Sequence, residues 1–333
     1  MNKSPRRRFS LSRRRIALSG RLAGAARLAP LAACLIIVAA VVGACSSPAT
    51  SSAASALSGT TSAGASGSPA AQGKAAAGVN DWTHVLQVLS MLSQSPPKDP
   101  IVVLLGGSAA RESTIKDAGP GSWAAQVAAD GGPAVATFNL GSRNRTLAQD
   151  VQIVQYLPRG SLVFVGINIG RFTEPKSSPK IVLPTSPSVD PGYVQHQYSV
   201  SNRLSDAKKK LMLNKWLATR YPEFLKHFKL NEQLLTTLVV RCKKQGLHVV
   251  LLDLPRNTDI IGKALDKPVS RMTAACKSVA AAQGVPWVDF VAQAHLPNAS
   301  FYDLWHVVMP GRTTWQSLLS EKTAELLKNY LGA

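Results

Sequence analysis

Ile101-Val102-Val103-Leu104-Leu105-Gly106-Gly107-Ser108 is the stretch of this sequence that decides its fold. Its apolar run, rich in β-branched residues, predicts a short strand that is buried on both faces. The Gly106-Gly107 pair then turns the backbone and leaves Ser108 at the carboxyl end of that strand. Ligand sites of open α/β sheets form at that end, so Ser108 is a candidate functional residue. The alternative is a serine that only caps the following helix.

Similar apolar runs alternate with segments of helical periodicity over residues 98–333. This alternation predicts one α/β domain, a parallel sheet covered by helices on both faces. The predicted strands are residues 101–105, 134–140, 162–167, 248–252 and 287–290, and the predicted helices are residues 123–129, 147–156, 231–244, 269–283 and 313–331. A separate N-terminal helical segment is predicted over residues 81–97, and Pro96-Pro97 ends it.

A second motif, Tyr302-Asp303-Leu304-Trp305-His306, precedes the last predicted helix. An Asp and a His three residues apart can supply a general base together with the carboxylate that orients it. A serine hydroxyl needs such a base to become a nucleophile. Two other loops follow predicted strands and carry Gly141 and Asn168, in Phe138-Asn139-Leu140-Gly141-Ser142 and Val165-Gly166-Ile167-Asn168.

Taken in order, these four blocks resemble those of the SGNH (GDSL-like) hydrolase family, which contribute a serine, a glycine, an asparagine and an Asp-x-x-His pair. The resemblance implies a flavodoxin-like three-layer sandwich with a five-stranded parallel sheet in the order 2-1-3-4-5. It also implies a catalytic triad of Ser108, Asp303 and His306. The implied oxyanion hole consists of the backbone N–H groups of Ser108 and Gly141 and the side-chain amide of Asn168.

Two positions depart from the usual family pattern. Gly107 stands where the first block usually has an aspartate, and Ile169 follows Asn168 where the third block usually has one. Neither change removes a residue that the mechanism requires. The departures suggest a divergent branch, closer to the SGNH-like proteins that modify cell-wall polymers than to the common secreted lipases.

The N-terminal 44 residues have the pattern of a bacterial export signal. They contain nine Lys or Arg residues and no acidic residue, with an apolar core from Leu28 to Val42. Ser12-Arg13-Arg14-Arg15 is a partial fit to a twin-arginine signal, and general secretion is the alternative route. Val42-Gly43-Ala44-Cys45 resembles a lipobox, so we expect a lipid on Cys45 that anchors the protein to the outer face of the cytoplasmic membrane. The alternative is a transmembrane anchor.

Residues 45–80 are dominated by Ala, Ser, Gly, Thr and Pro and predict a disordered tether. A second irregular region is an insertion at residues 170–230, which has five prolines between positions 175 and 191 and then a helix-like stretch at 205–219. Its length and its position after Asn168 make it a candidate substrate lid, and a plain surface excursion is the alternative. Within it, Lys208-Lys209-Lys210 predicts a solvated basic face.

The charge balance narrows the class of partner. The chain carries a net charge of +20, of which residues 1–44 contribute +9, and about +11 remains on the mature protein. Such a surface favours anionic lipid or wall polymers, with simple solubilisation as the alternative. Export and the lack of a recognisable motif argue against nucleic acid. We expect a monomer.

Cofactor and metal chemistry find no support in the sequence. No Cys or His pair has zinc-like spacing, and the glycine-rich turn lacks the lysine of a phosphate loop. Cys242 and Cys276 could form a disulfide in an exported protein or could be two buried thiols.

Together, the four blocks and the N-terminal signal predict a membrane-tethered, extracytoplasmic serine esterase or acyltransferase acting on O-acyl groups of cell-wall glycans. The alternative is a non-catalytic lipoprotein of the same fold that binds glycopolymer or assists envelope assembly.

Overall fold

The structure, a computed structural model, describes residues 81–175, 178–190, 193 and 196–331. Its centre is a five-stranded parallel sheet in the order β2-β1-β3-β4-β5. The strands are β1 (Val102–Gly106), β2 (Thr137–Gly141), β3 (Leu162–Ile167), β4 (His248–Asp253) and β5 (Trp287–Asp289). The predicted fold class and strand order are confirmed.

β1 lies between β2 and β3, and every one of its residues is buried. Val103 and Leu105 pack into the core on one face of the sheet, and Val102 and Leu104 pack into the core on the other. In the strand register Gly106 is paired with Gly141, so the chain leaves β1 and β2 at the same edge of the sheet. Because all the strands are parallel, the loops that follow them meet at that edge.

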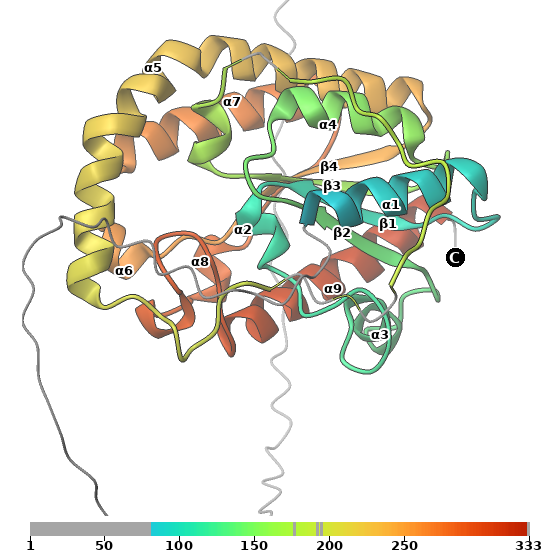
Figure 1. Cartoon of the computed structure of the whole chain (residues 1–333), viewed down its shortest axis with the longest axis horizontal. Coiled ribbons are helices and arrows are strands. Elements are labelled where there is room, and N and C mark those ends of the chain that lie inside the picture. The colour runs from blue at the N-terminus through green and yellow to red at the C-terminus, as the bar shows by residue number, and fades with distance from the viewer. Residues whose placement is uncertain (1–80, 176–177, 191–192, 194–195, 332–333) are drawn as a thin grey trace, which may run out of the picture. The chain divides into compact units, whose positions relative to one another are not determined.

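Helices cover both faces of the sheet (Figure 1). One face is covered by α1 (Asp81–Gln94), α4 (Leu147–Ile153), α5 (Asp206–Lys244) and α7 (Asp266–Gln283), and the other by α3 (Trp123–Ala129) and α9 (Gly311–Leu331). The short helices are α2 (Ser108–Arg111), α6 (Thr258–Ile261) and α8 (Val291–Ala294), and 3₁₀ turns span Val154–Tyr156 (η1), Ile169–Phe172 (η2) and Asn298–Ser300 (η3). No helix in the described part of the chain is long and apolar enough to cross a bilayer.

The prediction of separate helices at 205–219 and 231–244 was wrong. The structure has one helix of 39 residues, α5, that begins after the Ser205 cap and contains Pro222. A proline removes one hydrogen bond and bends a helix without always ending it. Figure 1 shows α5 curving from the side of the sheet over its upper face. The insertion and the scaffold thus share a single helix.

The described residues between 178 and 204 form neither helix nor strand. Hydrogen bonds hold this segment to the helices beneath it: the Ser90 hydroxyl donates to the Pro184 carbonyl over 2.6 Å, and the Gln197 N–H donates to Glu112 over 2.9 Å. The prediction that Lys208-Lys209-Lys210 forms a solvated face was wrong for Lys209, which is fully buried. Its ammonium donates to the carbonyls of Asn298 and Phe301, close in sequence to the Asp303 loop.

Cys242 on α5 and Cys276 on α7 are free, buried thiols, so the disulfide that the sequence allowed is not formed. Burial raises the pKa of both thiols, that of Cys242 to about 12, which leaves them un-ionised at neutral pH. The predicted signal peptide, the tether and the lipidation site at Cys45 lie outside the described residues.

Candidate active site

Ser108 is the first residue of α2, directly beyond the carboxyl end of β1. The turn between them requires glycine at position 106, where a Cβ atom would lie only 2.5 Å from the Ala110 side chain. Gly107 caps the helix with extended backbone angles. The nucleophile candidate therefore stands on a short, tightly packed strand-to-helix turn.

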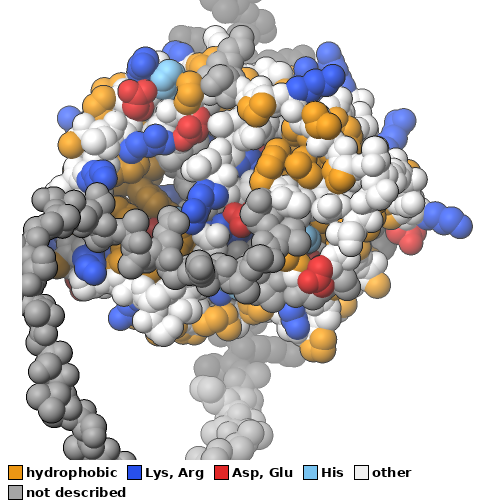
Figure 2. Space-filling view, viewed as in Figure 1, with side chains coloured by type: hydrophobic (Ala, Val, Ile, Leu, Met, Phe, Trp, Pro, Cys, Tyr) orange, Lys and Arg blue, Asp and Glu red, His pale blue; other side chains and the backbone are white. Residues whose placement is uncertain are grey.

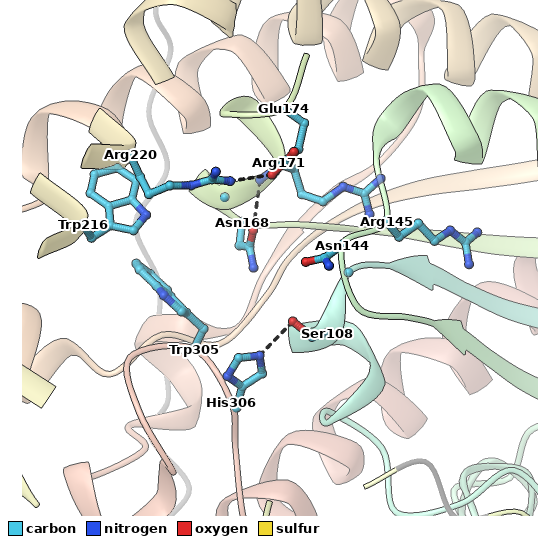
Figure 3. A pocket seen from close by; sticks show the side chains of 12 residues that line it. Ser108, Asn144, Arg145, Asn168, Arg171, Glu174, Trp216, Arg220, Trp305 and His306 are labelled. Carbon is cyan, nitrogen blue, oxygen red and sulfur yellow. Dashed lines mark hydrogen bonds and ion pairs between the residues drawn. The ribbon is translucent and has the colours of Figure 1, made fainter. Parts of the chain in front are cut away.

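His306 and Asp303 reach Ser108 from the loop that precedes α9. His306 Nε2 lies 2.9 Å from Ser108 Oγ, and His306 Nδ1 lies 2.7 Å from Asp303 Oδ2 (Figure 3 draws the first of these). The loop is fixed from outside by the Asn257 side-chain amide, which donates to the Asp303 carbonyl over 3.1 Å. The structure thus brings together the three predicted triad residues as one hydrogen-bonded chain.

The environment of Asp303 keeps its carboxylate ionised. Burial alone raises the pKa of this carboxyl, but the His306 imidazole and two N–H groups outweigh that effect and lower it below its ordinary value. The N–H groups are those of Trp305 and His306, which donate to Oδ1 over 2.8 and 2.9 Å. With His306 Nδ1–H donated to Asp303, Nε2 is free to accept the serine proton.

Tyr198, from the insertion, covers one side of the histidine. Its ring centroid lies 4.8 Å from that of His306 and 4.1 Å from that of Tyr302. These contacts restrict the rotation of the imidazole. They also show that the irregular part of the insertion, just before α5 begins, reaches the candidate site.

Asn168 lies at the end of β3 and caps the η2 turn. Its Oδ1 accepts the Arg171 N–H over 3.3 Å, which leaves the side-chain NH₂ as the group available to donate. Figure 3 shows this amide extending toward the space above Ser108 and His306. An amide donor in that position can hydrogen-bond a carbonyl oxygen of a bound ester.

Gly141 does not take the place that the family resemblance implies. Its N–H donates to the Asn139 side-chain oxygen over 2.9 Å, and the residue does not line the cavity next to Ser108. A Cβ atom at this position would lie 2.4 Å from the Arg111 backbone nitrogen, so glycine allows β2 to approach α2. Gly141 therefore has a packing role in this structure.

Asn144 occupies the place beside Ser108 instead. It lies in the loop after β2, lines the cavity and has a φ of 57°. Asparagine adopts this left-handed conformation more readily than most residues, which was the available sequence signal. No hydrogen-bond partner of the Asn144 N–H is found among the described residues. This N–H is accordingly a candidate oxyanion donor.

The cavity that holds Ser108 has a volume of about 220 Å³. The Trp216 and Trp305 rings stand together on one side, with centroids 6.4 Å apart (Figure 3). Above them Arg220 forms an ion pair with Glu174 at 2.5 Å. No sequence pattern marked these four lining residues as a group, because α5, the segment after η2 and the Asp303 loop bring them together only in the folded chain.

The chain is similar to some solved structures at low sequence identity. No family model and no curated protein matches the sequence. Solved structures similar to it include a putative acylhydrolase from Bacteroides fragilis, at 14% identity and a TM-score of 0.41 over 73% of this chain and 98% of the other. A GDSL-like lipase from Bacteroides thetaiotaomicron has 12% identity and a TM-score of 0.41 over 74% and 98%. A catalytic mutant of an acetylxylan esterase from Geobacillus stearothermophilus has 13% identity and a TM-score of 0.41 over 68% and 96%. These solved structures, described as an acylhydrolase, a GDSL-like lipase and an acetylxylan esterase, are similar to the chain at 12–14% identity.

Proposed function

We propose that this chain is an SGNH-type serine esterase or acyltransferase that acts on small O-acyl groups of cell-envelope carbohydrate. The observation that carries the proposal is the hydrogen-bonded chain from Ser108 Oγ through His306 to Asp303, with distances of 2.9 and 2.7 Å. A serine in contact with a base, which is in turn oriented by an ionised carboxylate, is the arrangement that activates a hydroxyl for attack.

The proposed reaction has two steps. Ser108 Oγ attacks the ester carbonyl carbon while its proton moves to His306 Nε2, and Asp303 stabilises the imidazolium. The oxyanion receives hydrogen bonds from the backbone N–H groups of Ser108 and Asn144 and from the Asn168 amide. The carbon–oxygen bond to the alcohol then breaks, and the alkoxide takes the proton from His306. Water, or a sugar hydroxyl in a transferase, attacks the acyl-enzyme by the same route and releases Ser108.

The cavity favours a small acyl group. A volume of about 220 Å³ lies below the roughly 300–1,000 Å³ typical of pockets that enclose drug-sized ligands. The Trp216 and Trp305 rings offer flat apolar surfaces, and Glu174 and Arg220 offer hydrogen-bonding groups above them. Sugar rings combine apolar C–H faces with hydroxyl edges and suit such a mixture.

The envelope location in this proposal rests on the N-terminal sequence. Export and a lipid on Cys45 would hold the domain at the outer face of the membrane, within reach of envelope glycans. We expect the soluble domain, residues 80–333, to retain the site, because the core formed by the sheet and its helices lies within it.

Labelling with a fluorophosphonate tests the proposal, because the probe reacts with serines activated by a base. We expect the wild-type domain to be labelled and Ser108→Ala and His306→Ala to stay unlabelled. Ser142→Ala is the matched control, since Ser142 is buried near the site but outside the cavity. An unlabelled wild type that is folded by circular dichroism would contradict the proposal and favour a glycan-binding protein without turnover.

Ester substrates of graded length then test the acyl group. We expect acetyl esters to be cleaved faster than octanoyl esters, and an added glycan acceptor to divert product from hydrolysis only in a transferase. Equal rates for both acyl lengths would contradict the small-acyl proposal.

A further inference from the structure

A buried cluster of three charged side chains lies next to the Ser108 cavity. The Asp150 carboxylate, on α4, lies between two guanidinium groups: Oδ1 accepts from Arg145 Nε over 2.5 Å, and Oδ2 accepts from Arg171 Nη2. The exposed fractions of the three side chains are 0% for Asp150, 0% for Arg145 and 3% for Arg171. Both arginines line the cavity with Ser108 (Figure 3).

The cluster is connected to both loops that carry the candidate oxyanion donors. Arg145 directly follows Asn144, and its Nη1 donates back to the Leu140 carbonyl on β2. Arg171 donates its backbone N–H to Asn168 Oδ1, which sets the direction of the Asn168 amide. Asp150 therefore joins the loop after β2 to the turn after β3. If either loop moved, its arginine would lose the ion pair with Asp150.

The charges of the cluster do not balance. Two guanidinium groups share one carboxylate, which leaves one surplus positive charge in a buried position. Arg145 Nη2, Arg171 Nε and Arg171 Nη1 are buried, and none of them has a hydrogen-bond partner in the described part of the chain. Burial lowers the pKa of Arg145, and the adjacent Arg171 charge lowers it further, against the raising effect of Asp150. Surplus charge in such a place is unfavourable in the resting protein.

We propose that Arg171, held by Asp150, is a positioning residue of the oxyanion hole and that its surplus charge favours the negatively charged tetrahedral state over the neutral ester. This inference rests on the proposed esterase function and adds a residue to its machinery. A fixed positive charge in a buried site stabilises a developing negative charge more than it does in water. A neutral ester gains little from it, so the effect falls on the transition state.

Two substitutions separate the charge from the shape of the side chain. Arg171→Met removes the surplus charge and leaves the neutral Arg145–Asp150 pair. Arg171→Lys keeps the charge. We expect Arg171→Met to lower kcat by about 10- to 100-fold with KM changed less than about threefold, and Arg171→Lys to recover most of that loss; this is less than the loss of a direct oxyanion donor, because Arg171 acts at a distance.

A boronic acid inhibitor gives a readout that folding alone does not move. Its adduct with Ser108 is a tetrahedral anion, so we expect Arg171→Met to weaken its binding by a factor close to the loss in kcat, while binding of the neutral product alcohol is unchanged. Arg256→Met is the matched control, because Arg256 pairs with the buried Asp253 at 2.7 Å at the end of β4, outside this cavity. We expect it to change the unfolding midpoint but not kcat or boronate affinity.

Wild-type kcat and boronate affinity in a folded Arg171→Met protein would overturn the inference. If Arg171→Met does not fold, an Arg171→Lys protein that folds but loses both quantities to the level of Asn168→Ala would overturn the role of the charge. Failure of the proposed function is a separate result, because the wild type itself would then react with neither fluorophosphonate nor ester.

Discussion

Asn144 and Asn168 contribute to the candidate site through different atoms. Asn144 has a φ of 57° and lines the cavity, and our proposal assigns its backbone N–H as an oxyanion donor. Asn168 contributes its side-chain NH₂, because its Oδ1 is occupied by the Arg171 N–H. One role depends on backbone conformation, and the other depends on a particular side chain.

This difference predicts opposite outcomes for the two positions. We expect Asn144→Gly to keep kcat within about threefold of wild type, because glycine adopts positive φ freely and retains the N–H. We expect Asn168→Ala to lower kcat by about 10²- to 10³-fold, the usual effect of losing one oxyanion donor. The measurement is steady-state hydrolysis of an acetyl ester by the two variants and the wild type.

Equal losses in the two variants would contradict the assignment of Asn144 as a backbone donor. Circular dichroism and the unfolding midpoint serve as controls, since both substitutions are in loops and remove no apolar contact. A large loss in Asn144→Gly with an unchanged fold would instead assign a role to the Asn144 side-chain amide.

At the level of elements, the contact between β2 and α2 depends on one residue. A Cβ atom on Gly141 would lie 2.4 Å from the backbone nitrogen of Arg111 and 2.8 Å from its Cα. A backbone neighbour cannot rotate away as a side chain can. The spacing between β2 and the helix that begins with Ser108 is therefore set by the absence of a side chain at position 141.

We expect Gly141→Ala to lower the free energy of unfolding by about 1–3 kcal/mol, the usual cost of overpacking a close contact. Gly107→Ala is the matched control, because a Cβ atom there would lie 3.9 Å from its nearest neighbour, the Arg171 Cδ, and the backbone φ is −80°. We expect it to change stability by less than about 0.5 kcal/mol. Chemical denaturation of both variants checks this. Equal unfolding free energies would contradict the packing role of Gly141.

The sequence predicted the sheet and most of its helices because apolar periodicity reflects burial directly. The strand at 162–167 and the helix at 123–129 have the predicted bounds in the structure. Continuity of α5 through Pro222 was not predictable, since a proline in a sequence is a helix-ending signal and only tertiary packing overrides it. Lys209 looked solvated because a run of charges carries no sign of the carbonyls that surround one of its members.

The candidate triad was predictable in a way that the rest of the site was not. Asp303 and His306 are close in sequence, and Ser108 follows a strand, so local patterns mark all three. The resemblance implied Gly141 as an oxyanion donor, but its N–H already donates to the Asn139 side chain, and Asn144 becomes the candidate instead. The sequence does not show which N–H groups are already bonded. The Arg145–Asp150–Arg171 cluster joins two loops and a helix, and no local pattern indicates such a contact.

At the scale of the whole molecule, the distribution of basic side chains bears on the kind of partner, and one face shows them spread out rather than gathered in one patch. On the face shown in Figure 2, Lys and Arg side chains lie around the whole outline, with a few Asp and Glu side chains among them. This distribution on that face fits general solubility or loose association with an anionic surface better than a single groove for a polyanion.

The free energy of unfolding depends on pH, and the Asp117 carboxyl makes a strong contribution to this dependence. Burial raises the pKa of Asp117 to about 7, although a hydrogen bond from the Asn139 N–H, over 2.9 Å, lowers it in part. In the unfolded chain an aspartate titrates near pH 4. Between about pH 4 and 7 the folded protein thus keeps a proton that the unfolded chain releases, and stability falls as the pH rises.

Asp117→Asn removes this titration and keeps an oxygen that can accept the Asn139 N–H. We expect the stability gain of the variant over wild type to be about 3 kcal/mol larger at pH 7.5 than at pH 4.5, from the free-energy equivalent of a pKa raised from about 4 to about 7. Urea denaturation of both proteins at the two pH values checks this. A stability difference that is the same at both pH values would contradict the raised pKa of Asp117.

The contact between Ser108 and His306 joins residues 198 positions apart in the chain. The nucleophile lies in the first strand-to-helix turn of the sheet, and its base lies just before the final helix. A chain that stops short of residue 306 contains the serine and both asparagines but nothing to accept the serine proton. If the proposed function holds, ester cleavage therefore begins only after nearly the whole polypeptide has been made and folded. In our proposal, the order of these residues in the chain is by itself enough to prevent activity in an incomplete polypeptide.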